Sequence, residues 1–435
     1  MHSIVIDLGF GDAGKGTIVD ALARWNPNTS AVVRFNGGAQ AAHNVVTDDG
    51  VHHTFAQYGS ASLTGVPTFL GPEFMLNPIN LFNESEALDQ LIPRPWERLS
   101  IHPDALVITP YHQRLNQKTA AHGTTGQGIG ETMKDSLRQD DSQVLRARDL
   151  LDRKTFIEKF IRVKSRKIQE ARKLRVPLLT PGGDDNPDME FIDRCLWLAD
   201  NGCVRNNLQE LADQGDLIFE GAQGVLLDQD HGFHPHTTWS RTTHHNALQL
   251  LSSLRNGADR QMIGVLRTYQ TRHGAGPFVT EHVGLVTEPH NTSDGWAGQF
   301  RTGHLDFVAL RYALEVCPVD SLAVTHMDKV GDTIPVCDSY RYRGTMPDLD
   351  PYFYRDGDDV KLIHRSPDPE SSHAHMEAIT NRLSDMGSVL TVVAREKLIG
   401  TIEEKLGRPV TIVSSSPSFS GKKMETLDAT KEVLA

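Results

Sequence analysis

The sequence has few cysteines, no long apolar run and no excess of positive charge. Its four cysteines, Cys195, Cys203, Cys317 and Cys337, include no C-x-x-C pair. This argues against a disulfide framework and a zinc site, and it favours a reducing cytoplasm. No apolar run approaches the roughly 20 residues that a membrane span requires, so we expect no membrane association. The opening residues are typical of a buried strand, and we expect no secretion signal there.

The net charge of −12 limits the partners of this protein. A nonspecific grip on nucleic acid requires a basic surface that displaces counterions from phosphates, so we expect no nucleic-acid partner. Any nucleotide bound here is then a small molecule in a local pocket. Histidine pairs such as His52-His53 and His244-His245 lack the i, i+4 spacing of a helical metal site.

Alternating strand and helix patterns predict an α/β fold with a mostly parallel central sheet. Residues 3–8 form an apolar strand, residues 9–16 a glycine-rich turn and residues 17–25 a helical pattern. Further strands are expected at residues 31–35, 105–108, 217–219, 262–266, 321–324 and 410–413, and helices at residues 153–174, 241–254 and 305–316. We expect one large domain over residues 1–435, with a helical insertion at about 85–215 and a small antiparallel insertion at about 333–375 as peripheral subdomains.

The first candidate site is the turn after the first strand, where residues 9–17 read G-F-G-D-A-G-K-G-T. The pattern G-x-x-x-x-G-K is typical of a loop that cradles phosphate with backbone N–H groups, a helix N-terminus and a lysine. Gly16 stands where a standard phosphate loop has the Ser or Thr that holds magnesium, and Thr17 follows it. Asp12 would repel phosphate unless it binds a metal or moves a proton. The alternative is a glycine-rich turn that only caps a helix.

Three further segments combine small residues with polar side chains. Residues 36–44 end in His43-Asn44, and residues 122–130 hold a run of glycines and hydroxyls suited to a monophosphate. Residues 219–228 present Glu220 and Gln223 after a strand, at the carboxyl end of the sheet where α/β proteins bind ligands. Taken singly, the first two would more often be ordinary loops.

Together and in this order, the four segments resemble the adenylosuccinate synthetase family. That family has W-G-D-E-G-K-G-K, G-G-x-N-A-G-H, G-T-T-G-x-G-I-G and E-G-A-Q-G-x-L-L-D-x-D-H-G, which residues 10–17, 37–43, 123–130 and 220–232 match. Residues 271–278 resemble its T-R-V-G-A-G-P-F, and residues 301–306 its R-T-G-W-L-D. Residues 325–328 stand where the family has its guanine reader T-K-L-D, and residues 414–417 where it has S-T-G-P. The resemblance covers nearly the whole chain.

The resemblance implies a role for each matching residue. Asp12 takes a proton from purine N1 and binds Mg²⁺, with the Ala42 carbonyl as a second ligand. His43 helps the γ-phosphate move to the purine O6, and Gln223 stabilises charge there. The implied triphosphate contacts are Gly11, Asp12, Ala13, Gly14, Lys15, Gly16, Thr17, Ala42, His43 and Asn44. The implied guanine contacts are His326, Asp328, Ser414 and Ser416, the purine monophosphate contacts are Gln40, Thr124, Thr125, Arg138, Gln223 and Thr238, and the amino-acid contacts are Arg272 and Arg301.

The implied reaction is the joining of L-aspartate to C6 of IMP, driven by GTP through a 6-phosphoryl intermediate. Phosphorylation comes first because a 6-oxo group leaves poorly until it is activated. The resemblance further implies Mg²⁺ as cofactor, with ATP as the alternative donor. It also implies a homodimer, because the arginine matched by Arg138 normally comes from the neighbouring subunit.

Several positions depart from the family. Its T-T-G-R-R-R-R-T-G loop lies opposite residues 295–303, where three of four consecutive arginines are missing. Those arginines hold the carboxylates of aspartate and reach the ribose, and a lost charge-assisted pair costs on the order of 1.5–3 kcal/mol. Gln40 replaces Asn, Ala13 replaces Glu and His326 replaces Lys.

These departures leave alternatives open. One is the same chemistry on dGMP, as in the family members that make 2-aminoadenine DNA, although many of those carry a smaller hydroxyl residue at the position of Asp12. Another is a nucleotide-binding paralogue without activity, against which Asp12, His43 and Gln223 together argue. A mechanical NTPase fits less well, because it would require the Ser or Thr that Gly16 replaces.

Overall fold

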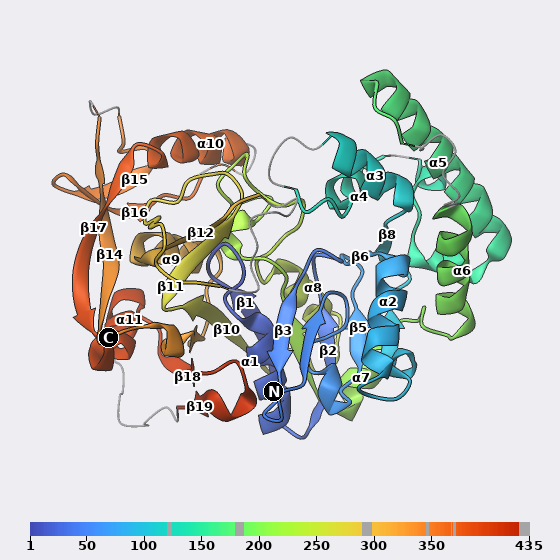
Figure 1. Ribbon diagram of the computed structural model, residues 1–435, viewed down its shortest axis with the longest axis horizontal. Coiled ribbons are helices and arrows are strands. Elements are labelled where there is room, and N and C mark those ends of the chain that lie inside the picture. The colour runs from blue at the N-terminus through green and yellow to red at the C-terminus, as the bar shows by residue number, and fades with distance from the viewer. Residues whose placement is uncertain are drawn as a thin grey trace.

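The computed structural model describes residues 1–119, 124–138, 140–178, 187–288, 298–344, 348–366, 368 and 371–425. A central sheet runs through the middle of the molecule (Figure 1). Its strands follow one another in the order β19 (Lys422–Met424), β18 (Val410–Ser414), β13 (Ser321–Thr325), β10 (Arg260–Arg267), β1 (His2–Asp7), β9 (Asp216–Glu220), β2 (Thr29–Arg34), β5 (Thr68–Leu70) and β7 (Leu99–Ile101). All neighbours are parallel except β18 and β19. The predicted α/β class with a mostly parallel sheet is confirmed.

Six of the seven predicted strands lie in this sheet, and the exception is residues 105–108. There β8 (Leu106–Val107) pairs with β6 (Met75–Leu76) in a separate two-stranded sheet. The strands β5 and β7, at one end of the sheet, were not predicted, because three residues are too few to show a period. A further small hairpin joins β3 (His43–Val46) to β4 (His52–Phe55).

Helices lie around the central sheet as the α/β pattern requires. They are α1 (Lys15–Trp25), α7 (Leu208–Gln214), α8 (His245–Ser252), α9 (Phe307–Val316) and α11 (Leu398–Leu406). The helix expected at 241–254 is shorter at both ends. The helix expected at 305–316 begins at Phe307, because β12 continues through Asp306. Asp306 then caps α9 by accepting hydrogen bonds from two backbone N–H groups of its first turn.

A helical region projects from the end of the sheet near β7 (Figure 1). It contains α2 (Pro78–Asp89), α3 (Pro110–Thr119), α4 (Ile129–Ser136), α5 (Arg153–Leu174) and α6 (Pro187–Asp200). The helix predicted at 153–174 matches α5, which starts where Asp152 accepts from Thr155 N and ends at the left-handed Arg175. The apolar core of this helical region includes Phe156, Phe160 and Phe191. The Pro-rich break from 177 to 187 falls largely outside the described residues.

A second sheet lies on the opposite side, next to α9 and α10 (Ser372–Leu383) (Figure 1). It is built from β11 (Tyr269–His273), β12 (Phe300–Asp306), β14 (Thr333–Tyr342), β15 (Phe353–Asp356), β16 (Asp359–Ile363) and β17 (Met386–Ala394). The antiparallel strands expected within 333–375 are present, and β14 forms its longest ladder with β17, beyond that range. The boundaries of the two predicted insertions stay predictions.

Candidate functional site

The candidate residues gather at the carboxyl ends of neighbouring parallel strands. The phosphate loop follows β1, at the middle of the sheet. The candidate guanine residues follow β13 and β18 on one side, and Gln40 and Gln223 follow β2 and β9 on the other. This edge is where open α/β sheets bind ligands. The fold therefore brings segments from both ends of the chain together around the loop.

The side chain of Asp7 fixes the conformation of the phosphate loop. Its carboxylate is 1% exposed and accepts hydrogen bonds from Gly9 N at 2.8 Å and Ala13 N at 2.9 Å. Lys15 Nζ lies 3.0 Å from the same carboxylate and is 3% exposed. Gly14 takes a left-handed conformation, with φ of 87°, directly before α1 begins. The loop is thus fixed by an acid at the end of a strand, and its lysine is placed at the start of the helix.

The structure explains why Gly16 stands in place of a magnesium-binding hydroxyl residue. A Cβ at this position would lie 2.7 Å from His43 Cβ and 2.9 Å from Ser60 Oγ, closer than real Cβ atoms approach. The departure from the standard phosphate loop therefore makes room for His43. Thr17, the next residue, donates through Oγ1 to the carbonyl of Pro417 at 3.0 Å.

His43 forms a buried pair with Glu220. The Nδ1–Oε1 distance is 2.5 Å, and the side chains are 9% and 0% exposed. Ser60 donates to the same carboxylate from its backbone N, at 2.9 Å, and from its hydroxyl. Burial lowers the pKa of His43. Burial alone would raise the pKa of Glu220, but the positive charge of Arg34 and the contact with His43 lower it to about 2. Glu220 therefore stays ionised and orients the imidazole through Nδ1.

Asp12 is held in an unusual backbone conformation, with φ of 60°. Its carbonyl accepts a hydrogen bond from Arg267 Nε, and its Oδ2 lies 3.2 Å from His273 Nε2. Burial would raise the pKa of Asp12, but the hydrogen bond with His273 and the charges of Arg267 and Lys15 lower it to about 2. Non-glycine residues with positive φ are uncommon, and they occur at functional sites as well as at the ends of helical segments, as Arg94 and Arg175 do here. Gln223 and His326 share this feature, with φ of 57° and 61°.

Gln40 and Gln223 present buried amide atoms without a hydrogen-bond partner. These atoms are Gln40 Nε2, Gln40 Oε1 and Gln223 Oε1. A Cβ built on Gly37 would lie 3.6 Å from Gln223 Oε1 and 3.6 Å from Gln40 Nε2, so both amides reach the same spot. Asn36 and Ala222 exchange two hydrogen bonds, which tie the two segments together. Buried polar atoms left without partners are costly and indicate a place for a polar ligand.

The candidate guanine residues lie beside the phosphate loop. His326 is bonded to Thr325 Oγ1 at 2.8 Å, and burial with the charges of Arg267 and Lys329 lowers its pKa to about 2. The Asp328 carboxylate is partly exposed and lies 3.7 Å from Lys329 Nζ. Ser414 Oγ donates to the carbonyl of Ser416 at 3.2 Å. Asp328 thus keeps acceptor capacity for a ligand, and His326 is a neutral group.

Three of the candidate monophosphate residues, Thr124, Thr125 and Thr238, lie in two loops. Thr124 Oγ1 donates to Asn116 Oδ1 at 3.0 Å, and the same oxygen accepts from Gly128 N at 3.1 Å, which shapes the loop before α4. Thr125 is exposed next to it. Thr238 N donates to the carbonyl of Leu227 at 2.9 Å. The first residues of the motif, 122 and 123, lie outside the described residues.

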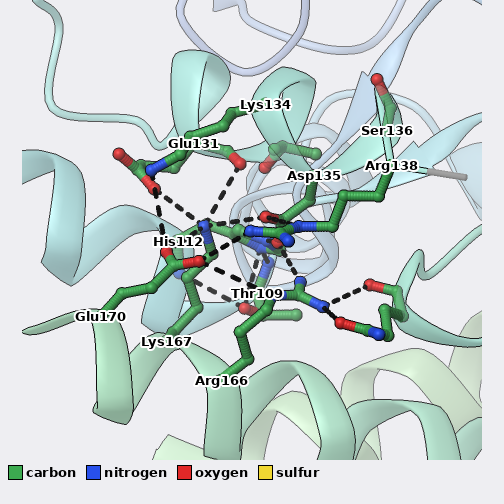
Figure 2. Close-up of polar contacts among 12 residues, drawn as sticks. Thr109, His112, Glu131, Lys134, Asp135, Ser136, Arg138, Arg166, Lys167 and Glu170 are labelled. Carbon is green, nitrogen blue, oxygen red and sulfur yellow. Dashed lines mark hydrogen bonds and ion pairs between the residues drawn. The ribbon is translucent and has the colours of Figure 1, made fainter. Parts of the chain in front are cut away.

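Arg138 is occupied within its own chain (Figure 2). Its Nη2 lies 2.8 Å from Glu170 Oε1, and its Nε lies 3.4 Å from Asp135 Oδ1. Both acids belong to a cluster with Lys167 that joins α4 to α5. To reach a monophosphate, as the resemblance implies, this guanidinium would first leave these partners. The contact of Arg138 with the purine monophosphate stays a prediction.

The two arginines predicted to bind the amino-acid substrate also form contacts within the chain. Arg272 is 1% exposed, lies over the Phe10 ring at 4.3 Å and donates to the carbonyl of Pro277 at 2.7 Å. Arg301 pairs with Glu281 at 2.9 Å and donates to the carbonyl of Gly274 at 2.7 Å. In this arrangement they hold the loop between β11 and β12. Residues 295–297 of the altered arginine loop lie outside the described residues.

The metal candidates are compatible with Mg²⁺. Ala42 is exposed, and the Asp12 carboxylate is 37% exposed. Magnesium commonly takes one or two protein oxygens and leaves the remaining positions to water and substrate phosphates. In the described part of the chain, no group of three or more His, Cys, Asp or Glu side chains could hold a metal ion by itself. Asn44, a candidate for the triphosphate, uses its Oδ1 to accept from Thr54 at 2.7 Å within the β3–β4 hairpin.

Sequence reasoning missed five side chains that complete the site: Asp7, Arg34, Ser60, Arg267 and His273. An acid at the end of a buried strand just before a glycine-rich loop was a usable signal for Asp7. The others carried none, because each acts across the sheet on a residue far away in the sequence.

Comparison with known proteins agrees with this geometry. The profile of the adenylosuccinate synthetase family matches residues 4–421. The chain belongs to the adenylosuccinate synthetase family. It is 32% identical to the adenylosuccinate synthetase of Thermoplasma volcanium, over 96% of each chain, and 30% identical to that of Coxiella burnetii, over 96% of this chain and 95% of the relative. Members with this name are ligases that form C–N bonds.

Two solved structures show the same fold. The fully ligated adenylosuccinate synthetase of Plasmodium falciparum superposes with a TM-score of 0.80 at 20% identity, over 98% of this chain and 100% of that one. The succinoaminodeoxyadenylate synthetase of cyanophage S-2L, bound to dGMP and dATP, gives 0.56 at 16% identity, over 97% and 94%. Among the described residues, no helix is long and apolar enough to cross a membrane.

Proposed function

We propose that this family member is a GTP-dependent ligase that joins L-aspartate to C6 of a 6-oxopurine nucleotide, converting IMP to adenylosuccinate. The observation that carries this proposal is the placement of Asp12, the His43–Glu220 pair and the Gln223 amide, whose Oε1 is buried without a hydrogen-bond partner among the described residues, around one phosphate loop. This set can activate an oxygen by phosphorylation and stabilise charge on it. A nucleotide binder without chemistry would have no need of all three groups.

Each group has a step that its environment supports. The Asp12 carboxylate, ionised at neutral pH, accepts the proton of purine N1. His43, oriented by Glu220, turns its Nε2 toward the phosphoryl group that moves to O6. Gln223 donates to O6 as negative charge develops there, and such preorganised donors supply a large part of rate enhancement. Asp12 and the Ala42 carbonyl would hold Mg²⁺, which would supply charge neutralisation at the phosphates. Aspartate then displaces phosphate from C6.

GTP is the proposed donor because the Asp328 carboxylate can accept paired hydrogen bonds from guanine N1 and N2. The triphosphate contacts are residues 11–17 with Ala42, His43 and Asn44, and Ser414 and Ser416 lie beside the base. ATP is the alternative, since the cyanophage relative is described with dATP as its energy donor. Parallel assays with the two triphosphates decide between them.

The same chemistry on dGMP is the second candidate function. The cyanophage relative is bound to dGMP, and this chain lacks three of the arginines that the resemblance assigns to aspartate and the ribose. Asp12 favours IMP, because the 2-aminoadenine type often carries a smaller residue there.

We also infer a homodimer in the cytoplasm. The four described cysteines are buried and unpaired, as in a reducing compartment.

The test is phosphate release from GTP with Mg²⁺ and aspartate, comparing IMP with dGMP and confirming the succinyl product by mass. Turnover with IMP is expected. Turnover with dGMP alone would establish the second candidate, and phosphate release without any purine would contradict a ligase. Light scattering of the purified protein tests the homodimer.

A further inference from the structure

The loop that follows β18 closes around the side chain of a buried lysine. We call residues 415–421, which join β18 to β19, the serine loop. Lys422 is the first residue of β19 and is 6% exposed. Its Nζ donates to three consecutive carbonyls of the loop, those of Ser416 at 3.2 Å, Pro417 at 3.1 Å and Ser418 at 2.6 Å. An ammonium has three N–H donors, so the three carbonyls satisfy its full donor capacity.

Two of these carbonyls also connect the serine loop to other parts of the site. The Pro417 carbonyl accepts from Thr17 Oγ1 at 3.0 Å as well as from Lys422. The Ser416 carbonyl accepts from Ser414 Oγ at 3.2 Å as well as from Lys422. Thr17 ends the phosphate loop, and Ser414 and Ser416 are the serines proposed to lie beside the base of the donor. Lys422 therefore holds the backbone that joins the base side of the triphosphate site to its phosphate side.

The charge of Lys422 is maintained in a buried place. The charged and titratable groups around it lie on three elements and are Asp20 and Arg24 of α1, Asp48 of the turn between β3 and β4, and His326 and Asp328 after β13. Burial has the largest effect and lowers the pKa of Lys422 to about 8, although the three carboxylates oppose this and Arg24 adds to it. The side chain is therefore charged at pH 7 and mostly neutral at pH 9.

The ammonium has a physical role in keeping the serine loop closed. Carbonyl oxygens that converge on one point repel one another unless a positive charge lies between them. A neutral amine has only two N–H donors, so deprotonation of Lys422 leaves one of the three carbonyls without its hydrogen bond. Loss of the charge and loss of the side chain therefore act in the same direction, since each weakens the closed conformation of the loop.

We propose that Lys422 is a positioning residue for the nucleoside triphosphate, and that its ammonium holds the serine loop in the conformation that receives the guanine base. This inference rests on the proposed function, in which GTP is the phosphate donor and Ser414 and Ser416 lie beside its base. Lys422 acts through the loop and touches neither the base nor the phosphates.

The test is the affinity of the full-length protein for GTP with Mg²⁺, measured by calorimetry without purine monophosphate or aspartate. Lys422→Met removes the ammonium and keeps the length of the side chain. At pH 7 this variant is expected to bind GTP about tenfold more weakly, the effect of losing hydrogen bonds from a charged group. Tripolyphosphate, which has no base, should bind equally to both proteins. The matched control is Lys423→Met, because Lys423 is the exposed neighbour in the same strand, and it should bind GTP as the wild type does.

The pH dependence separates the charge of Lys422 from its volume. The tenfold difference between wild type and Lys422→Met should shrink to about twofold at pH 9, because the wild type has then lost most of its charge. Ionisation of GTP affects both proteins and cancels in the ratio. If Lys422→Met does not fold, as its urea midpoint would show, the wild type alone carries the test, and its GTP affinity should fall about fivefold between pH 7 and pH 9.

Three results would overturn the proposal: equal GTP affinities of wild type and a folded Lys422→Met at pH 7, an equal loss for tripolyphosphate, or an affinity difference that does not change with pH. Absence of GTP binding to the wild type would overturn it as well. The succinyl product tests the proposed function separately. If GTP binding depends on Lys422 in a protein that forms no such product, the proposed function fails and the role of Lys422 stands.

Discussion

Among the described residues, two buried histidine–carboxylate pairs occur, and they differ in the ring nitrogen that each leaves available. His43 lies 2.5 Å from Glu220 beside the phosphate loop, and His112 lies 2.8 Å from Asp135 between α3 and α4. The exposed fractions are equally low, at most 9% and 4%. Burial lowers the pKa of both histidines. By burial and distance alone, the two pairs would be assigned the same role.

The second ring nitrogen distinguishes them. His112 accepts from Thr109 N through Nδ1 at 3.0 Å and donates to Asp135 through Nε2, so both nitrogens are used. Asp135 also contacts Arg166 and Lys167, which fixes α4 to α5 (Figure 2). Within the part of the chain that the structure describes, His43 forms a hydrogen bond through Nδ1 alone, with Glu220. A pair with one nitrogen available can act on a ligand, whereas a pair with both engaged holds helices together.

The strongest test of this distinction is to remove the imidazoles in turn. His43→Asn is expected to lower kcat by about 10³-fold, within the range for loss of a proton-transfer group. The exposed His245 at the start of α8 is the matched control, and His245→Asn should leave kcat within twofold of wild type. Steady-state phosphate release gives kcat, and a urea midpoint close to wild type shows that His43→Asn is folded. Retained turnover in that variant would contradict the role of His43.

The reciprocal change is Asp135→Ala in the other pair. Asp135 meets three buried or half-buried cations and a histidine, and removing one member of a buried ionic cluster costs about 3–5 kcal/mol of unfolding free energy. Equilibrium urea unfolding measures this loss. The exposed Asp193 on α6 serves as control, since Asp193→Ala should change stability by about 0.5 kcal/mol at most. If kcat per folded molecule fell as far as in His43→Asn, the division between catalytic and structural pairs would be wrong.

A smaller effect is expected when Glu220 is replaced by Gln. The amide can no longer stabilise the imidazole as a charged acceptor, so His43 loses its orientation and kcat should fall about 10²-fold with little change in KM. The exposed Glu210 of α7 provides the control variant Glu210→Gln. An equal fall of kcat and rise of KM would instead point to a collapsed phosphate loop, because Ser60 shares the Glu220 carboxylate.

The same distinction shows what the sequence could and could not predict. The phosphate loop and the strand before it were predictable, because glycine spacing and apolar runs are local features of the chain, and His43 was assigned through its place in the family motif. The environment of His43 was not predictable, since Glu220 lies 177 residues from it and accepts in turn from Ser60, which is 160 residues from Glu220. The ladder between β14 and β17 was missed because residues 386–394 were not predicted to form a strand.

The arginines show a further limit of sequence reasoning. Arg138, Arg272 and Arg301 were assigned to ligands by their place in a motif, and in the structure each donates to groups of its own chain. A motif gives the residue type and its element, whereas the partners of a long side chain depend on packing. The short and strongly constrained Asp12 and Gln223 are identified more directly, since their positive φ marks positions that the fold holds under strain.

The smallest expected effect is the pH dependence of the Asp135 cluster. Burial alone would raise the pKa of Asp135, but His112, Lys167 and Arg166 hold it well below its unfolded value of 3.8. A carboxyl with a lowered folded pKa contributes stability that is present above the unfolded pKa and lost as the pH falls below it. The stability difference between wild type and Asp135→Asn should therefore be constant from pH 8 to pH 6 and shrink by about 0.6 kcal/mol by pH 3.5. Urea titrations of the two proteins at each pH measure this difference in unfolding free energy, and the contributions of the other carboxyl groups cancel in it. A difference that grows on acidification would mean that Asp135 is protonated in the folded cluster.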